Sequence, residues 1–283
     1  MSLMVTVYAP EGIVMAADSR LTWSTTEEKG DRHMVHSAVS MTDSNYKVFL
    51  TPSDVGISTY GAADVGGVPI SRHIDAFINE TLRLKDAADE PAEVASLLLK
   101  HFRAFTPPPA THFYVAGYTK GPGRRFQQAR EVDIARDSVV PTKPLDKPEF
   151  YGASWGGEAY IMDRLLGKVL TMTDAEEFQP VTSYEVPWGF FTLQDAVDFA
   201  VYAIRSTIDS IRFQMRPKTV GGPIDVLVIK PERAWWVQRK ELRAWRTAHR
   251  SNARAAPGPP ASDACRSRTY AGHRGLLETW TMA

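Results

Sequence analysis

The chain has 283 residues, with 33 Lys and Arg balanced by 33 Asp and Glu, and one cysteine. The zero net charge gives no signal for binding nucleic acid or an anionic membrane. A single cysteine, Cys265, excludes an internal disulfide framework and a clustered thiolate metal site. No apolar run approaches the ~20 residues of a membrane span. The N-terminus lacks a basic segment followed by an apolar one, so we expect a cytoplasmic protein.

The first twenty residues predict a hairpin, with strands at 3–9 and 12–17 joined by a Pro-Glu-Gly turn. The first strand directly follows Met1 and Ser2. Because a residue as small as Ser favours removal of the initiator Met, we expect the mature chain to begin with Ser2. A hydroxyl and a free α-amino group on one residue form a nucleophile with its own base. The alternative interpretation is an ordinary edge strand.

Two further strands are predicted at 46–51 and 54–60, followed by helices at 68–85 and 91–105. Lys47 lies on the first of these strands, and Gly61 follows the second. Lys47 would supply positive charge, and Gly61 an unobstructed backbone N–H for an oxyanion. The two residues therefore indicate one candidate site.

The second half of the domain predicts strands, a short helix, a long helix and a last strand pair. Thr192 and Asp195 form a capping-box pattern that opens the long helix. This order of elements predicts an α+β fold. The expected ranges are 111–119, 126–134 and 147–151 for strands, 157–166 and 192–213 for helices, and 224–229 and 234–237 for the last strands.

The chain divides into a domain at 1–238 and a basic, Pro- and Ala-rich extension at 239–283, which we expect to be disordered. The alternative for the extension is a tail that docks on a neighbouring subunit.

A polar insertion at 23–43 contains His33 and His36, whose spacing suits a metal if the segment is helical. No third ligand is evident, so we predict no metal site.

Several ordered segments resemble the proteasome-like branch of the N-terminal-nucleophile (Ntn) hydrolases, which includes proteasome β subunits, HslV and bacterial ancestral β-type homologues. The resemblance implies a four-layer αββα sandwich of two antiparallel sheets between helix layers. It extends over roughly residues 2–230. The matching segments are Gly12–Arg20, Tyr46–Phe49, Gly56–Asp64, His112–Tyr118 and Tyr151–Ser154 with Tyr160–Asp163.

The resemblance implies a role for each matched residue. Ser2 would attack the scissile carbonyl, and its α-amine would take the proton. Lys47 would lower the pKa of the nucleophile and the amine by its charge, and Asp18 would pair with Lys47. The N–H of Gly61 would face the oxyanion, and Arg20 would support the site.

The sequence departs from the family pattern in three places. The nucleophile is Ser rather than the usual Thr. The serine expected in the family's Gly-Ser-Gly segment falls on Ala153, with Ser154 one place away as a supporting residue. The Asp and Ser that precede a late Gly-Gly have no clear counterparts before Gly221 and Gly222.

The same strands suggest a substrate pocket. Leu21 and Phe49 are apolar, and Thr59 and Ala63 are small. This set predicts a roomy, uncharged pocket that accepts an apolar side chain on the acyl side of the cleaved bond. The alternative is ordinary core packing around a hairpin.

The resemblance implies a threonine/serine-type peptidase that cleaves peptides or unfolded chains inside a homo-oligomeric ring, served by an unfolding ATPase. No cofactor, nucleic acid or membrane is expected. One alternative is a non-catalytic structural subunit or scaffold of a proteasome-like assembly. Another is a small-molecule amidase or acylase of the wider superfamily.

Overall fold

The computed structural model describes residues 2–29, 32–83, 89–120, 123–144, 146–147, 149–167, 170–172, 177–181 and 184–241, with only the backbone for 24–41. Contacts define one compact unit at Met1–Glu241. Residues 239–241 of the expected extension therefore belong to this unit. Residues 242–283, for which we expect disorder, lie outside the described residues.

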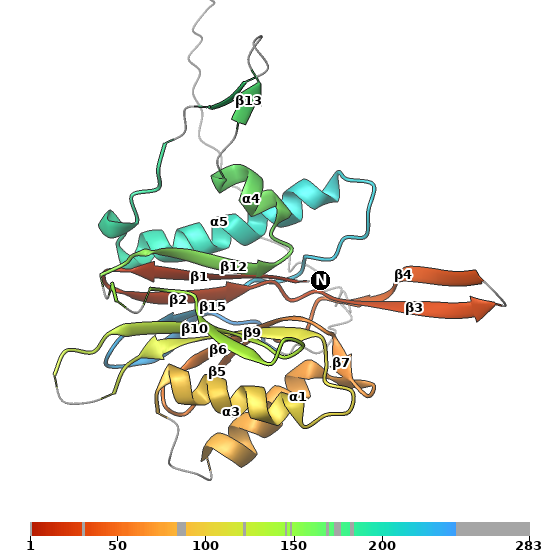
Figure 1. The fold of residues 1–283 in the computed structure, drawn as a ribbon, viewed down its shortest axis with the longest axis horizontal. Helices are drawn as coiled ribbons and strands as arrows, with labels where there is room; N and C mark the ends of the chain where they lie inside the picture. The colour runs from red at the N-terminus through yellow and green to blue at the C-terminus, as the bar shows by residue number, and fades with distance from the viewer. Residues whose placement is uncertain are drawn as a thin grey trace, which may run out of the picture. The chain divides into compact units, whose positions relative to one another are not determined.

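The first sheet contains the N-terminal hairpin and the C-terminal strand pair (Figure 1). Its neighbouring strands are all antiparallel. The N-terminal hairpin forms as the sequence predicts, because two apolar runs flank a turn at Pro10 and Glu11. The order is β12 (Gly152–Gly157), β1 (Leu3–Ala9), β2 (Gly12–Ala17), β15 (Asp225–Ile229) and β16 (Ala234–Gln238).

The second sheet is also five-stranded and antiparallel. Its central strand, β9, pairs with β10 on one side and β6 on the other. The order is β11 (Ser138–Pro141), β10 (Gln127–Asp133), β9 (Thr111–Tyr118), β6 (Gly56–Gly61) and β5 (Val48–Leu50).

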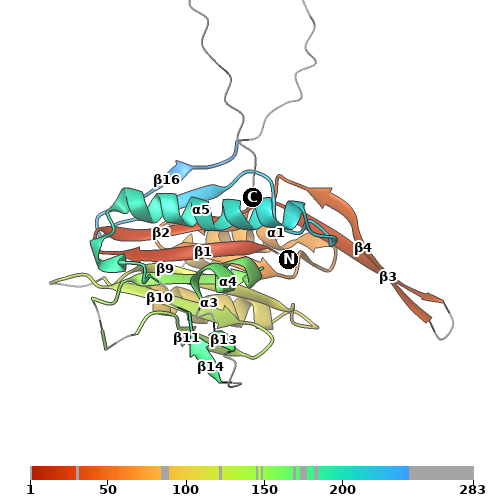
Figure 2. The same ribbon diagram turned by 90° about the horizontal axis from the view of Figure 1, so that it is seen from above.

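Helices α4 (Tyr160–Leu166) and α5 (Leu193–Arg212) pack against the first sheet (Figures 1 and 2). Alternate residues of β1 point toward α5, as the period of a strand requires; they are Leu3, Val5, Val7 and Ala9. The predicted capping box of α5 is confirmed, because the Thr192 hydroxyl accepts from the Asp195 N–H at 3.2 Å and Asp195 accepts from the Thr192 N–H at 2.8 Å.

The second sheet packs against α1 (Ile70–Ala76), the π-helix η1 (Phe77–Leu82) and α3 (Pro91–Arg103). Another apolar cluster joins the two sheets and includes Met4, Tyr8 and Met15 from the first and Tyr114 from the second. The chain is therefore a mixed helix and sheet fold in which each sheet packs against its own helices (Figure 1).

The insertion forms a long hairpin of β3 (Leu21–Lys29) and β4 (Arg32–Thr42), which extends away from the two sheets in Figures 1 and 2. His33 and His36 lie on β4, so the helical spacing that a metal site would need is absent. Shorter elements are β7 (Asp64–Val65), β8 (Val68–Pro69), β13 (Leu170–Met172), β14 (Phe178–Pro180) and the 3-10 helix η2 (Trp188–Phe190).

One strand lies later in the chain than the sequence predicts. A strand was expected at 147–151 and a helix from 157, whereas β12 covers Gly152–Gly157 and α4 begins at Tyr160. The two glycines, Gly156 and Gly157, pair with Met4 and Leu3 instead of opening the helix. Within the described residues, no helix combines the length and apolar character needed to cross a membrane.

Candidate active site

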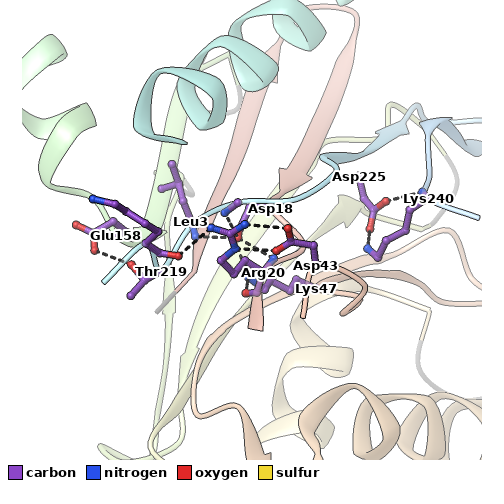
Figure 3. A network of polar contacts seen from close by, with 11 residues as sticks. Leu3, Asp18, Arg20, Asp43, Lys47, Glu158, Thr219, Asp225 and Lys240 are labelled. Atoms are coloured by element: carbon purple, nitrogen blue, oxygen red, sulfur yellow. Dashed lines mark hydrogen bonds and ion pairs between the residues drawn. The ribbon is translucent and has the colours of Figure 1, made fainter. Parts of the chain in front are cut away.

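Asp18 lies at the end of β2 and is fully buried. One carboxylate oxygen accepts from the Leu3 N–H at 3.0 Å and from Lys47 Nζ at 2.8 Å. The other accepts from the N–H groups of Arg20 and Gly221, each at 3.0 Å (Figure 3). Asp18 therefore joins four separate parts of the chain around one buried negative charge.

Lys47 immediately precedes β5, and its side chain is 3% exposed. Its ammonium donates to Asp18 and, at 2.5 Å, to the carbonyl of Arg20. Burial lowers the pKa of Lys47, and the neighbouring Asp18 carboxylate opposes that change. The pair thus places a fixed cation in the interior.

Arg20 and Asp43 form a two-pronged ion pair, with Nε–Oδ1 at 2.7 Å and Nη2–Oδ2 at 2.8 Å (Figure 3). The hydrogen bonds from Arg20 hold the pKa of Asp43 below its usual value. Arg20 also donates to the Lys218 carbonyl at 3.2 Å. A Cβ on Gly221 would lie 2.5 Å from the guanidinium carbon, so any larger residue there would displace the end of the Arg20 side chain.

Ser2 is 9% exposed and lies at the start of β1. Its carbonyl accepts from the Glu158 N–H at 2.8 Å. Gly157 has φ +92°, and a Cβ there would lie 1.8 Å from the Ser2 carbonyl oxygen. The end of β12 therefore holds the backbone of Ser2 through a contact that only glycine permits.

The predicted site residues lie around one small cavity. Ser2, Lys47 and Gly61 all line it, together with Arg20. Of the four predicted pocket residues, Leu21, Thr59 and Ala63 also line it, whereas Phe49 does not. Phe49 packs in the core between the second sheet and its helices, because alternate residues of a strand face opposite sides.

The cavity differs from the expected pocket in size and lining. Its volume is about 30 Å³. Its lining includes the polar residues Thr22 and Asn45 as well as Arg20. The lining is therefore more polar than the expected uncharged pocket, and its acceptance of an apolar side chain stays a prediction. The sequence could not reveal how closely β3 approaches β6.

Ser154 does not reach Ser2. It pairs with Thr6 on β1 and accepts from the Tyr8 hydroxyl at 3.2 Å. The residues beside Ser2 are instead Gly157 and Glu158. The proposed supporting serine is therefore misplaced, because the true register of β12 brings the Gly-Gly pair to this position.

Sequence reasoning missed a buried polar cluster beside Ser2. Glu158 is 5% exposed, and its carboxylate forms an ion pair with Arg216 Nη2 at 2.9 Å. Thr219 Oγ1 donates to the same oxygen at 3.4 Å (Figure 3). Thr219 lies two residues before Gly221, so one segment contacts both Glu158 and Asp18. The only sequence signal was a glutamate directly after two glycines.

The described residues contain no group of three or more His, Cys, Asp or Glu side chains that could hold a metal ion. The cations that line the cavity are Lys47, paired with Asp18, and Arg20, paired with Asp43. A hydroxyl, a buried ammonium and a glycine beside one small cavity are suited to acyl transfer.

Comparison with solved structures relates this fold to that of a known protein. The Anbu (Gly-1) mutant from Hyphomicrobium sp. strain MC1 aligns with a TM-score of 0.51, over 85% of this chain and 86% of that chain. The chain has the fold of Anbu. The identity to Anbu is 16%, so the likeness shows the fold alone. No family model and no curated protein matches the sequence.

Proposed function

We propose that the chain is an Ntn hydrolase of the proteasome type, a cytoplasmic peptidase whose nucleophile is Ser2 after loss of Met1. The observation that carries this proposal is the cavity shared by Ser2, Lys47 and Gly61, with Lys47 held by buried Asp18. The two sheets, each packed against its own helices, support the four-layer αββα sandwich of that family.

In this mechanism Ser2 Oγ attacks the carbonyl carbon of the scissile amide, and the Ser2 α-amine takes the hydroxyl proton. An unperturbed α-amine has a pKa near ~8, and the charge of Lys47 favours its neutral, basic form. The Gly61 N–H stabilises the oxyanion. The amine then protonates the leaving nitrogen, and water hydrolyses the acyl ester to regenerate Ser2.

The proposed substrates are peptides or unfolded chains that enter a homo-oligomeric ring, with an unfolding ATPase as partner. Confinement would protect folded proteins from a nucleophile that cleaves any accessible segment. A non-catalytic scaffold is the second candidate. It is favoured by the residues beside Ser2, Gly157 at the end of β12 and Glu158 directly after it, which bring no hydroxyl to the amine.

Intact mass before and after exposure to a peptide epoxyketone tests the proposal, because this reagent needs a hydroxyl and an adjacent free amine. We expect loss of Met1 and one adduct, mapped to Ser2. The Ser2→Ala variant should fold and form no adduct, whereas Ser96→Ala, on the exposed side of α3, should react fully. Retained Met1 without an adduct would favour the scaffold. Turnover of a small amide by a monomer or dimer would favour an amidase.

A further inference from the structure

We propose that Thr111 is a positioning residue of the candidate active site, which orients and polarises the backbone N–H of Gly61. This inference rests on the proposed function, in which that N–H stabilises the oxyanion. Thr111 is the first residue of β9 and is fully buried. It acts through one peptide group, not through contact with the substrate.

The peptide group between Tyr60 and Gly61 connects Thr111 to the oxyanion. Thr111 Oγ1 donates to the Tyr60 carbonyl at 3.0 Å. This carbonyl and the Gly61 N–H belong to the same peptide group. The peptide bond is trans, so its C=O and N–H point in opposite directions. The Gly61 N–H therefore points away from Thr111.

The pairing of β6 places this N–H on the side of the cavity. The Thr59 N–H donates to the Lys47 carbonyl at 3.0 Å. Because the N–H groups of a strand alternate between its two edges, the N–H of Gly61, two residues later, faces the same edge. The pairing of β5 with β6 ends at Val48 and Ser58, before Gly61. The Gly61 N–H thus faces the side of Lys47, which lines the same cavity.

The surroundings of this peptide group differ between its two ends. Gly61 is exposed, so a substrate carbonyl can reach its N–H, whereas Thr111 is fully buried and its hydroxyl has no competition from water. A hydrogen bond to a carbonyl polarises the peptide group and makes its N–H a stronger donor, by about 10–30% per bond. Thr111 therefore strengthens the N–H that would bind the oxyanion.

Thr111 is itself held in place. Its N–H donates to the Pro109 carbonyl at 2.9 Å, and its carbonyl accepts from the Ile134 N–H at 3.2 Å. Thr59 Oγ1 lies 3.3 Å from Thr111 Oγ1 and donates to the His112 carbonyl at 3.2 Å. These bonds leave the Thr111 hydroxyl little freedom to move away from β6.

The start of β9 also contacts Gly61 directly. Gly61 has φ +110°, and a Cβ there would lie 2.6 Å from the Ala110 carbonyl oxygen and 2.9 Å from Thr111 Cα. The Ala62 N–H donates to the same Ala110 oxygen at 2.9 Å. The chain is therefore held on both sides of the Gly61 N–H, by Thr111 before it and by Ala110 after it.

Thr111→Val tests the inference, because it removes the hydroxyl and keeps the branched shape. The assay uses the fluorogenic peptide that wild-type protein cleaves fastest. We expect kcat to fall about tenfold and KM to change by less than about twofold, since the lost bond acts on a donor used mainly in the transition state. Loss of an entire oxyanion donor would cost about 100- to 1,000-fold. Thr111→Ser restores the hydroxyl and should recover kcat to within about threefold of wild type.

Thr207→Val is the matched control. The Thr207 hydroxyl is also fully buried and donates to a backbone carbonyl, that of Ala203, at 3.0 Å within α5. Each variant loses one such hydrogen bond, so urea denaturation should show similar losses of stability. Equal kcat in the two variants, or a loss in Thr111→Val that Thr111→Ser does not restore, would overturn the inference. If Thr111→Val does not fold, Thr111→Ala and Thr207→Ala provide the same comparison.

A peptide aldehyde probes the oxyanion directly. Its carbonyl carbon bonds to Ser2 Oγ, and its former carbonyl oxygen takes the oxyanion position. The corresponding peptide alcohol binds without a bond to Ser2. In Thr111→Val the inhibition constant of the aldehyde should rise about tenfold, and that of the alcohol should stay unchanged. Equal shifts for the two inhibitors would mean that Thr111 affects binding in general, and would overturn the inference.

Epoxyketone labelling separates this inference from the proposed function. Slower labelling of Ser2 in Thr111→Val than in Thr207→Val supports the role of Thr111. Labelling at equal rates in the two variants overturns that role and leaves the proposed function intact. No labelling of wild-type protein, with no cleaved peptide, overturns the proposed function and this inference together.

Discussion

Asp18 and Lys47 are the most completely buried charged residues of the candidate site. Asp18 accepts from three backbone N–H groups besides Lys47, so its negative charge remains partly compensated without the cation. The pair therefore stabilises the fold as well as taking part in the proposed chemistry. Its removal should affect stability, which can be measured without any substrate.

We predict that Lys47→Met lowers the free energy of unfolding by about 3 kcal/mol, because a buried carboxylate loses its counter-ion. The double variant Asp18→Asn/Lys47→Met should be more stable than the sum of the single losses by at least about 1.5 kcal/mol. Urea denaturation of the four proteins measures both values.

An exposed ion pair provides the control for this cycle. Arg124 Nη1 lies 3.4 Å from Glu149 Oε1, and the two side chains are 69% and 68% exposed. Arg124→Met should cost less than about 0.5 kcal/mol, because water screens the charges. Additive losses at Asp18 and Lys47 would show that the two residues do not stabilise each other.

Single residues show what the sequence could predict about the site. The strand positions of Lys47 and Gly61 indicated one site, whereas the pairing of Asp18 with Lys47 was implied only by the family resemblance. Ser154 and Phe49 were misplaced because their positions depend on strand register, and a shift of a few residues changes which neighbour a side chain meets. Glu158 and Arg216 contact each other across 58 positions of sequence, and nothing local to either predicts that contact.

At the scale of elements, the end of β12 controls where Ser2 lies. Gly157 has a positive φ, and a Cβ added to it would clash with the carbonyl oxygen of Ser2. Gly66, in the turn between β7 and β8, also has a positive φ of +61°, but a Cβ there would have no atom within 4 Å. Both glycines have a positive φ, but only at Gly157 would a Cβ also clash with another residue.

We predict that Gly157→Ala lowers the free energy of unfolding by roughly 3 kcal/mol or more, since backbone strain is joined by a steric clash. It should also abolish epoxyketone labelling of Ser2. Gly66→Ala should cost about 1 kcal/mol from strain alone and leave labelling intact. Equal losses in the two variants would show that the contact with Ser2 is unimportant.

The elements that the sequence predicted well are those with strong local signals. The long helix α5 begins at its capping box, and β1 and β2 match the expected ranges. The insertion at 23–43 was not predicted to form β3 and β4, because its polar sequence lacks the apolar alternation of a buried strand. The two strands pair with each other in one hairpin and need no buried face. The apolar alternation that would predict them is therefore absent from the sequence.

At the scale of the whole molecule, the candidate site depends on both sheets. Asp18 follows a strand of the first sheet and Lys47 precedes a strand of the second, while Gly221 comes from the segment before β15. The apolar cluster between the sheets holds these parts in place. The site should therefore be lost in one step with global unfolding, which makes the stability of the entire unit relevant to function.

Global stability should depend on Lys143, a lysine that is 2% exposed and donates to the Phe150 carbonyl at 2.7 Å. Burial lowers the pKa of Lys143 to about 8, whereas an unfolded lysine titrates near ~10.4. Below pH ~8 both states are protonated, and burial of the charge costs stability. Between these values only the unfolded state keeps the proton, so stability rises with pH.

We therefore predict that the free energy of unfolding of wild-type protein rises relative to that of Lys143→Met as the pH increases from about 8 to about 10. Subtracting the variant removes the contribution of the other titrating groups, including Lys47 and Lys240, whose pKa values burial also lowers. Urea denaturation at pH 7, 8.5 and 10 measures the difference. A constant difference across this range would mean that Lys143 titrates alike in the folded and unfolded chain, and that its burial carries no charge penalty.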